Sequence, residues 1–284
     1  MPIAFLTGAT GFVGRHILKE LEARGYDVVI PVRQNWQDRI EIDAARTRVI
    51  ETADLFAETE DWWRDALHGV DLVVHSAWCA EPGTYLTSEK NLDCLAGTLR
   101  MAKVAREVGM TRFVGLGTCI EYEMSDAPLE LTSPLAPVTP YAGAKVAAFT
   151  ALQQWFLPSE VSFLWCRLFH LYGAGEHPNR LFPAIHNSLQ AGQVIDLTLG
   201  QQIRDFCPIE DAAKMIVDGA LSTVEGPANI CTGTGRSVRE LAEEIADQYG
   251  RRDLLNFGAR AENLMDPPRI VGVPTDFGRA NSNG

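Results

Sequence analysis

Short apolar runs alternate along the first half of the chain with longer segments in which apolar residues recur at helical spacing. The runs lie at residues 3–7, 27–32, 49–50, 72–75, 112–116 and 161–167, and the helical segments at 12–24, 89–108 and 141–156. Consecutive apolar positions in a short run indicate a strand buried on both faces, as in a parallel sheet covered by helices. The pattern predicts an α/β fold, with a Rossmann doubly wound parallel sheet over residues 1–166.

The rhythm loosens after residue 166 into loops, short strands and two further segments of helical period, 209–221 and 238–249. Ser237 and Glu240 stand three residues apart, the spacing of a capping box, which fixes the start of the second of these helices. We expect residues 167–284 to form mainly a smaller carboxy-terminal α/β substrate lobe. Some of its segments should return to the Rossmann core.

Composition excludes several classes of protein. A net charge of -12 would repel a nucleic-acid backbone, and no apolar stretch approaches the roughly 20 residues of a membrane span, so we expect neither nucleic acid nor membrane as a partner. The six cysteines form no C-x-x-C pair and the six histidines no H-E-x-x-H, so we expect reduced core thiols and no metal site. The chain begins in a strand without a basic leader, which favours a cytoplasmic location.

A glycine-rich turn follows the first predicted strand and opens the first predicted helix, with glycines at positions 8, 11 and 14. The first glycine permits a tight turn, the second lets backbone N–H groups approach a diphosphate, and the third lets helix and strand pack closely. The turn therefore predicts a dinucleotide site. Its cofactor-binding residues are Gly8, Thr10, Gly11, Phe12, Val13 and Gly14.

The end of the second predicted strand reads Val29-Ile30-Pro31-Val32-Arg33 and carries no carboxylate. An acid at this point would bind the ribose diol of NAD, whereas an arginine accommodates the 2′-phosphate of NADP. We therefore predict that Arg33 contacts this phosphate and that NADP(H) is preferred, with NAD(H) possible. The alternative is a solvated surface arginine.

Tyr141 and Lys145 begin a helix one turn apart, on the same face. Tyrosine has an ordinary pKa of about 10, and a neighbouring ammonium and an oxidised nicotinamide both favour the phenolate. One positive charge at about 4 Å contributes roughly 4 kcal/mol at an effective dielectric constant near 20, equivalent to about three pKa units, before desolvation offsets part of it. We therefore predict a pKa near neutrality for Tyr141.

Further motifs occur along the rest of the chain. They are Asp54-Leu55, His75-Ser76-Ala77, Asn91 with Gly97-Thr98, Thr118 with Tyr122, the R-x4-Y-G-x-G stretch at 167–175, Arg204-Asp205-Phe206 with Asp211, and Asp266-Pro267-Pro268-Arg269. Together with the glycine turn and the Tyr-Lys pair, they resemble the extended short-chain dehydrogenase/reductases, the NAD(P)-dependent epimerase/dehydratase family. The resemblance covers nearly the whole chain.

The resemblance implies roles for these residues. Thr118, Tyr141 and Lys145 would form the catalytic triad, with Lys145 also at the cofactor ribose. Asp54 and Leu55 would lie against the adenine, and Ser76 and Ala77 would also line the cofactor site. A nucleotide sugar would bind in the smaller lobe, and two copies of the helices at 89–108 and 141–156 would pair in a homodimer. The candidate substrate-binding residues are Trp78, His170, Arg180, Arg204 and Arg269.

One departure from the family pattern narrows the reaction. Dehydratases of the family carry Asp-Glu directly after the catalytic threonine, whereas Cys119-Ile120 stand here and cannot act as that acid/base pair. We therefore predict an NADP(H)-dependent reductase of a nucleotide-linked 4-keto-deoxysugar. A nucleotide-sugar 4-epimerase is the alternative enzyme, and a cofactor-sensing binding protein is the alternative without catalysis.

Several candidates also have a purely structural interpretation. Trp78 follows the fourth strand, where it can equally pack against the core, and His170 can be a loop histidine with satisfied hydrogen bonds. Glu121 is expected to be an exposed carboxylate in an acidic chain. The loops at 173–180 and 260–269 are expected to set substrate specificity.

Overall fold

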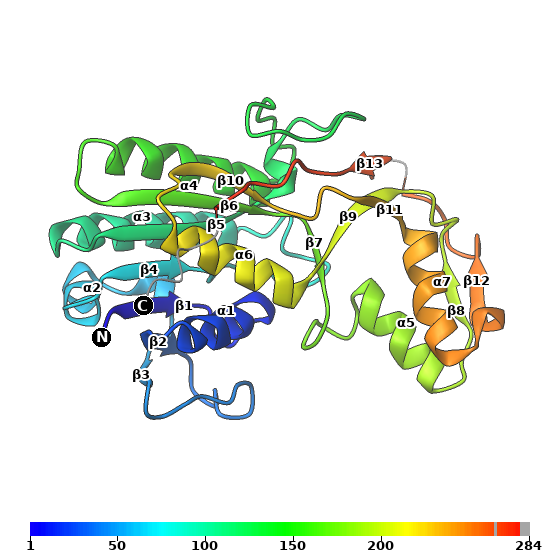
Figure 1. The fold of residues 1–284 in the computed structure, drawn as a ribbon, viewed down its shortest axis with the longest axis horizontal. Coiled ribbons are helices and arrows are strands. Elements are labelled where there is room, and N and C mark those ends of the chain that lie inside the picture. The colour runs from blue at the N-terminus through cyan, green and yellow to red at the C-terminus, as the bar shows by residue number, and fades with distance from the viewer. Residues whose placement is uncertain (264–265, 279–284) are drawn as a thin grey trace.

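The computed structural model describes residues 1–263 and 266–278, so part of the loop at 260–269 lies outside the described residues. Its centre is a seven-stranded sheet in the order β10-β6-β5-β4-β1-β2-β3, with every neighbouring pair parallel (Figure 1). The order reverses at β1, which lies between β2 and β4, as in a doubly wound Rossmann sheet. The strands are β1 (Ile3–Thr7), β2 (Asp27–Val32), β3 (Thr47–Glu51), β4 (Leu72–His75), β5 (Arg112–Thr118), β6 (Ser162–Leu168) and β10 (Gly226–Ile230).

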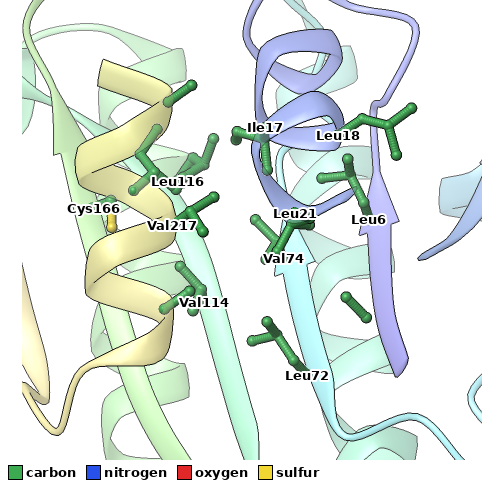
Figure 2. Packing of buried hydrophobic residues seen from close by; sticks show 14 of the residues in the cluster. Leu6, Ile17, Leu18, Leu21, Leu72, Val74, Val114, Leu116, Cys166 and Val217 are labelled. Carbon is green, nitrogen blue, oxygen red and sulfur yellow. The ribbon is translucent and has the colours of Figure 1, made fainter. Parts of the chain in front are cut away.

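Helices cover both faces of this sheet. One face packs against α1 (Phe12–Ala23) and α6 (Ile209–Leu221), and Figure 2 shows Ile17, Leu21 and Val217 directed at the strands. The other face packs against α2 (Glu60–Ala66), α3 (Lys90–Glu107) and α4 (Pro140–Phe156). Successive residues of a strand point to opposite faces of the sheet and therefore alternate between the two cores. In β1, for example, Leu6 packs on the side of α1 and Phe5 on the opposite side. This explains why the strands read as unbroken apolar runs.

A smaller lobe follows, at the right in Figure 1. Its four-stranded sheet contains β7 (His170–Tyr172), β9 (Ile203–Pro208), β11 (Gly235–Ser237) and β13 (Arg269–Ile270), and β8 (Ile195–Leu197) pairs with β12 (Leu255–Phe257). Helices α5 (Leu181–Gln190) and α7 (Val238–Tyr249) enclose its core. The predicted capping box of α7 is confirmed, since the Ser237 hydroxyl accepts from Glu240 N and the Glu240 carboxylate from Ser237 N.

Two segments of the second half lie on the large sheet and not in the smaller lobe. Strand β10 pairs with β6, and α6 packs beside α1. Within the described part of the chain, three 3-10 turns complete the elements: η1 (Leu55–Ala57), η2 (Cys119–Glu121) and η3 (Arg252–Leu254). Of the six cysteines, all free thiols, five are buried and Cys79 is half-buried. Across residues 1–263 and 266–278, the helices are too short or too polar to span a membrane.

Candidate active site

A cavity of about 1560 Å³ opens at the carboxyl ends of β1, β2, β4, β5 and β6, where the large sheet meets the smaller lobe. Open α/β sheets place their ligands outside the carboxyl ends of the strands, beside the point at which the strand order reverses. Here that point is β1, whose last residue, Thr7, leads directly into the glycine turn. The cavity therefore lies where the fold would hold a ligand.

The glycine turn forms one wall of the cavity, and its geometry requires glycine at two positions. Gly8 has a φ of +73°, and a Cβ there would lie 2.8 Å from Ala77 N. A Cβ on Gly14 would lie 2.1 Å from the Gly8 carbonyl oxygen. Gly11 caps α1 without a side chain, and no acidic residue stands in the first helical turn. A positive helix end without a capping carboxylate suits a diphosphate, so the turn fits a dinucleotide.

The far end of the cavity is lined by residues that follow β2 and β3. Arg33 is exposed there, and Asp54 and Leu55 line the same region. Asp54 also caps η1, since its carboxylate accepts from Phe56 N at 3.0 Å. Arg39 is a second arginine on this wall, and no motif in the sequence singled it out. Two guanidinium groups thus stand on the wall where the sequence predicted one.

A buried histidine organises the wall formed by Ser76 and Ala77. The Thr98 hydroxyl donates to Cys94 O, so it accepts from His75 Nε2–H at 2.8 Å. His75 Nδ1 then accepts from the Thr7 hydroxyl at 2.8 Å, and that oxygen accepts from Ala77 N at 3.0 Å. Burial lowers the pKa of His75 to about 3, so the ring stays neutral and keeps this arrangement at pH 7. The chain of hydrogen bonds ties β4 to β1 and α3.

The three predicted catalytic residues come from two neighbouring elements. Thr118 ends β5 and caps η2, while Tyr141 stands in the first turn of α4, after the Thr139 hydroxyl caps that helix. Both line the cavity. Lys145, one turn further along α4, is 3% exposed and lies behind the cavity wall. Its Nζ donates to Leu116 O at 2.6 Å and lies 6.0 Å from the centroid of the Tyr141 ring.

The predicted shift of the Tyr141 pKa toward neutrality is wrong for this structure. Burial raises the pKa of Tyr141 above its ordinary value, and the nearby Thr118 hydroxyl only partly opposes this. Burial also lowers the pKa of Lys145 to about 7. From the sequence, desolvation was expected to offset only part of the attraction between the two groups, whereas burial is the largest influence on the pKa of each. Tyr141 is therefore a neutral phenol at pH 7.

The expectation that Glu121 is exposed is also wrong. Its side chain is fully buried and forms an ion pair with Arg167, with Oε2 2.7 Å from Nε. The same carboxylate accepts from Thr118 N at 2.8 Å and from Trp165 Nε1 at 3.1 Å. Thr118, Trp165 and Arg167 thus all donate to this carboxylate. Through its bond to Thr118 N, Glu121 holds the backbone of Thr118 in place from behind the cavity. The sequence did not indicate this role, because an acidic residue in an acidic chain is usually exposed.

The smaller lobe and the loop after β4 supply the remaining wall. Trp78, His170, Arg180 and Arg204 line the cavity. Arg269, which stands in β13 and pairs with Ile203 of β9, does not. Arg204 is 4% exposed, and its Nη2 lies 2.7 Å from Asp266 Oδ1. Burial lowers the pKa of His170 to about 3, so it faces the cavity as a neutral ring.

Tyr85 and Glu176 are among the lining residues that the sequence analysis did not identify. Tyr85 packs edge-on against Tyr141, with ring centroids 4.9 Å apart. Burial raises the pKa of the Glu176 carboxyl to about 7, and Arg180 only partly opposes the shift. Glu176 stands one residue after the R-x4-Y-G-x-G stretch, which was the only available signal, and Tyr85 lies in no motif.

Comparison with known proteins identifies relatives of the same architecture. The sequence profile of the NAD dependent epimerase/dehydratase family matches residues 4–230. The chain is 24% identical over 246 residues to dTDP-6-deoxy-L-talose 4-dehydrogenase (NAD(+)) of Aggregatibacter actinomycetemcomitans, covering 86% of this chain and 89% of that protein. It is 26% identical over 281 residues to UDP-glucose 4-epimerase of Rhizobium meliloti (strain 1021), covering 90% and 85%. The solved structure of MoeE5 in complex with UDP-glucose and NAD matches with a TM-score of 0.79 at 25% identity, over 95% of this chain and 88% of that one.

Proposed function

This chain belongs to the NAD dependent epimerase/dehydratase family, and on that premise we propose that it reduces the 4-keto group of a nucleotide-linked deoxysugar with NADP(H). The observation that carries the proposal is the position of Tyr141 on the cavity wall with Thr118, where burial raises the pKa of the phenol. A reduction consumes a proton as well as a hydride, and a protonated phenol is the form that can give one.

The roles of the chain's own residues follow from their positions. Tyr141 donates its phenolic proton to the oxygen of the keto group as that oxygen gains negative charge, and the Thr118 hydroxyl donates a hydrogen bond to the same oxygen. The Lys145 ammonium stabilises the phenolate left behind. A bound nicotinamide would supply the hydride, with the diphosphate of the cofactor against Gly8–Gly14.

Dehydration is disfavoured by what stands after Thr118. Burial raises the pKa of the Cys119 thiol to about 12, and the hydrocarbon side chain of Ile120 has no ionisable group. The relative named a dTDP-6-deoxy-L-talose 4-dehydrogenase supports oxidoreduction at C4, since dehydrogenation and keto reduction are one reaction in opposite directions.

The cofactor preference rests on Arg33 and Arg39. Both guanidinium groups line the end of the cavity beyond β2, where a 2′-phosphate would gain charge-assisted hydrogen bonds. The solved relative carries NAD, so NAD(H) is the alternative. The substrate's own phosphates would meet Arg180 and Arg204 on the opposite wall.

The test is to follow NADPH absorbance at 340 nm with purified protein and a nucleotide-linked 4-keto-6-deoxyhexose. We expect oxidation of NADPH, and a loss of about 10²-fold or more in kcat for Tyr141→Phe, because the proton donor is removed. Absence of NADPH oxidation with every nucleotide 4-keto-sugar offered would overturn the proposal.

A sugar 4-epimerase is the second candidate, favoured by the relative named UDP-glucose 4-epimerase. The same triad would then oxidise C4 and return the hydride to the other face of the sugar. Protein that carries stoichiometric NAD(H) and inverts a UDP-hexose without net change at 340 nm would establish this reaction in place of the reductase.

We also propose a homodimer formed through α3 and α4. These helices expose Leu92, Leu99 and Trp155, and a shallow apolar groove lies between them. Light scattering should give a particle of two 31.2 kDa chains, and Leu99→Asp should shift it toward one chain. A single-chain particle for the unaltered protein would contradict the dimer.

A further inference from the structure

Trp78 follows β4 and lies between the cavity and the interior of the protein. Its side chain is half-buried and lines the cavity, and its edge packs against Phe56 with ring centroids 6.4 Å apart. Its Nε1 donates to Asn91 Oδ1 at 2.8 Å. The indole is therefore anchored from α3 while one part of it borders the cavity.

The anchor itself is rigid. Asn91 is fully buried, and its Nδ2 donates to Tyr85 O at 2.7 Å and to Ser88 O at 2.8 Å. With both amide protons on carbonyl oxygens and the amide oxygen accepting from the indole, the side chain has one satisfactory orientation. The position of the Trp78 ring is thus set by a satisfied amide.

The face of this indole is in contact with a charge. Lys145 Nζ lies 3.8 Å from the centroid of the Trp78 ring, well within the range of a cation–π interaction. The Trp165 and Tyr141 rings stand further away, at 5.8 and 6.0 Å. Among the described residues, no carboxylate lies within 4.0 Å of Nζ, whose hydrogen-bond acceptor is Leu116 O. An ammonium that is 3% exposed is therefore in direct contact with a carbonyl and an aromatic face, while the Glu121 carboxylate raises its pKa from beyond ion-pair distance.

We propose that Trp78 is a positioning residue for Lys145: its indole face binds the buried ammonium in place of a carboxylate and holds it beside Tyr141. The importance of this contact for catalysis rests on the proposed function, whereas the contact itself does not. The predicted contact of Trp78 with substrate stays a prediction, and it would involve the part of the ring that borders the cavity and not the face in contact with Lys145.

Other ionisable groups surround the ammonium and bear on its protonation. They are Tyr141 on α4, Glu121 on η2, Cys94 on α3 and His75 on β4. Burial keeps His75 neutral and raises the pKa of the Cys94 thiol to about 11, and Glu121 is paired with Arg167. Substitution of Trp78 leaves all four groups in place, so a change in Lys145 titration reports the indole.

Two substitutions distinguish a cation–π interaction of the indole with Lys145 from shielding of the ammonium by apolar bulk alone. Trp78→Phe keeps a π face and loses the hydrogen bond to Asn91, whereas Trp78→Leu keeps apolar bulk and loses the π face. Far-UV circular dichroism is used to check that both variants fold. The reactivity of Lys145 is then measured by trace labelling with acetic anhydride between pH 5 and pH 10, followed by peptide mass spectrometry. The four other lysines are exposed; Lys19, Lys90 and Lys214 serve as internal standards, whereas Lys103 is left out because its ion pair with Glu60 raises its pKa.

In the unaltered protein, Lys145 should titrate well below the four exposed lysines. Loss of the π face disfavours the ammonium, so the Lys145 pKa should fall by about one further unit in Trp78→Leu and stay close to the unaltered value in Trp78→Phe. An unchanged pKa in the leucine variant, or one that rises toward those of the exposed lysines, would overturn the proposal. The labelling uses neither cofactor nor sugar, so its result stands apart from the outcome of the NADPH assay.

Discussion

Replacing Glu121 by glutamine removes one charge from a buried ion pair and changes almost no volume. Glu121 and Arg167 are 0% and 1% exposed, so the guanidinium would be left without a counter-charge in the interior. The carboxylate also accepts from the backbone of Thr118 and from the Trp165 indole. Because all these partners are donors, the glutamine NH₂ must face an N–H group in either orientation.

The cost follows from these contacts. Removing one partner of a buried ion pair typically costs about 3–5 kcal/mol. We expect Glu121→Gln to lower the free energy of unfolding by about 3 kcal/mol, measured by urea unfolding at pH 7 with tryptophan fluorescence. Activity should fall as well, since a glutamine oxygen cannot accept from both the Thr118 backbone and the Arg167 guanidinium.

The matched control is an exposed ion pair, Glu60 with Lys103, whose nitrogen and oxygen are 2.7 Å apart. Glu60→Gln should cost less than about 1 kcal/mol. The double substitution Glu121→Leu with Arg167→Leu should be less destabilising than Glu121→Gln alone, because no buried charge remains. A loss below about 1 kcal/mol in Glu121→Gln would refute the reasoning.

Further predictions test other parts of the molecule. Gly14→Ala should abolish cofactor binding or folding, because its Cβ would lie 2.1 Å from a backbone oxygen, whereas Gly143→Ala meets nothing within 4 Å and should raise the thermal midpoint slightly; equal effects would contradict the packing described. The pKa values of His75 and His170, about 3 in place of 6.5, mean that the unfolded chain binds more protons between these values, so stability is complete above pH 6.5 and is lost as the pH falls. Urea unfolding at pH 5 should show a free energy of unfolding lower by about 2 kcal/mol for each of the two rings than at pH 7. In His170→Gln, the decrease between pH 7 and pH 5 should be smaller by the contribution of one ring. A midpoint that does not depend on pH would contradict this. Arg33→Ala should weaken NADPH binding about tenfold while leaving NADH binding unchanged, and an unchanged ratio of dissociation constants would argue against a 2′-phosphate contact.

The large sheet could be read from the sequence because each of its strands is buried on both faces. The resulting apolar runs, such as residues 72–75, are unambiguous, and the glycines at 8, 11 and 14 mark a turn that needs glycine sterically at positions 8 and 14. The helical spacing of apolar residues also predicted α6 and α7 with the same first and last residues as in the structure. For such elements, the pattern of neighbouring residues is sufficient to predict the secondary structure.

The environment of single side chains could not be read in the same way. Glu121 looked like surface because its partner, Arg167, is 46 residues away, on the neighbouring strand β6. The protonation of Tyr141 depended on a burial that no spacing reveals. Trp78 and Lys145 come from different elements and meet only when β4 and α4 pack on the same core. Such pairings depend on tertiary contacts and therefore need coordinates.

The most direct test of the proposed chemistry is a crystal structure of the protein with NADP and a nucleotide-linked deoxysugar. The cofactor diphosphate should contact the backbone of residues 8–14, and the Tyr141 hydroxyl should lie within about 3.2 Å of the oxygen on the sugar C4. A diphosphate bound elsewhere, or a C4 oxygen out of reach of that phenol, would contradict the proposed role of Tyr141.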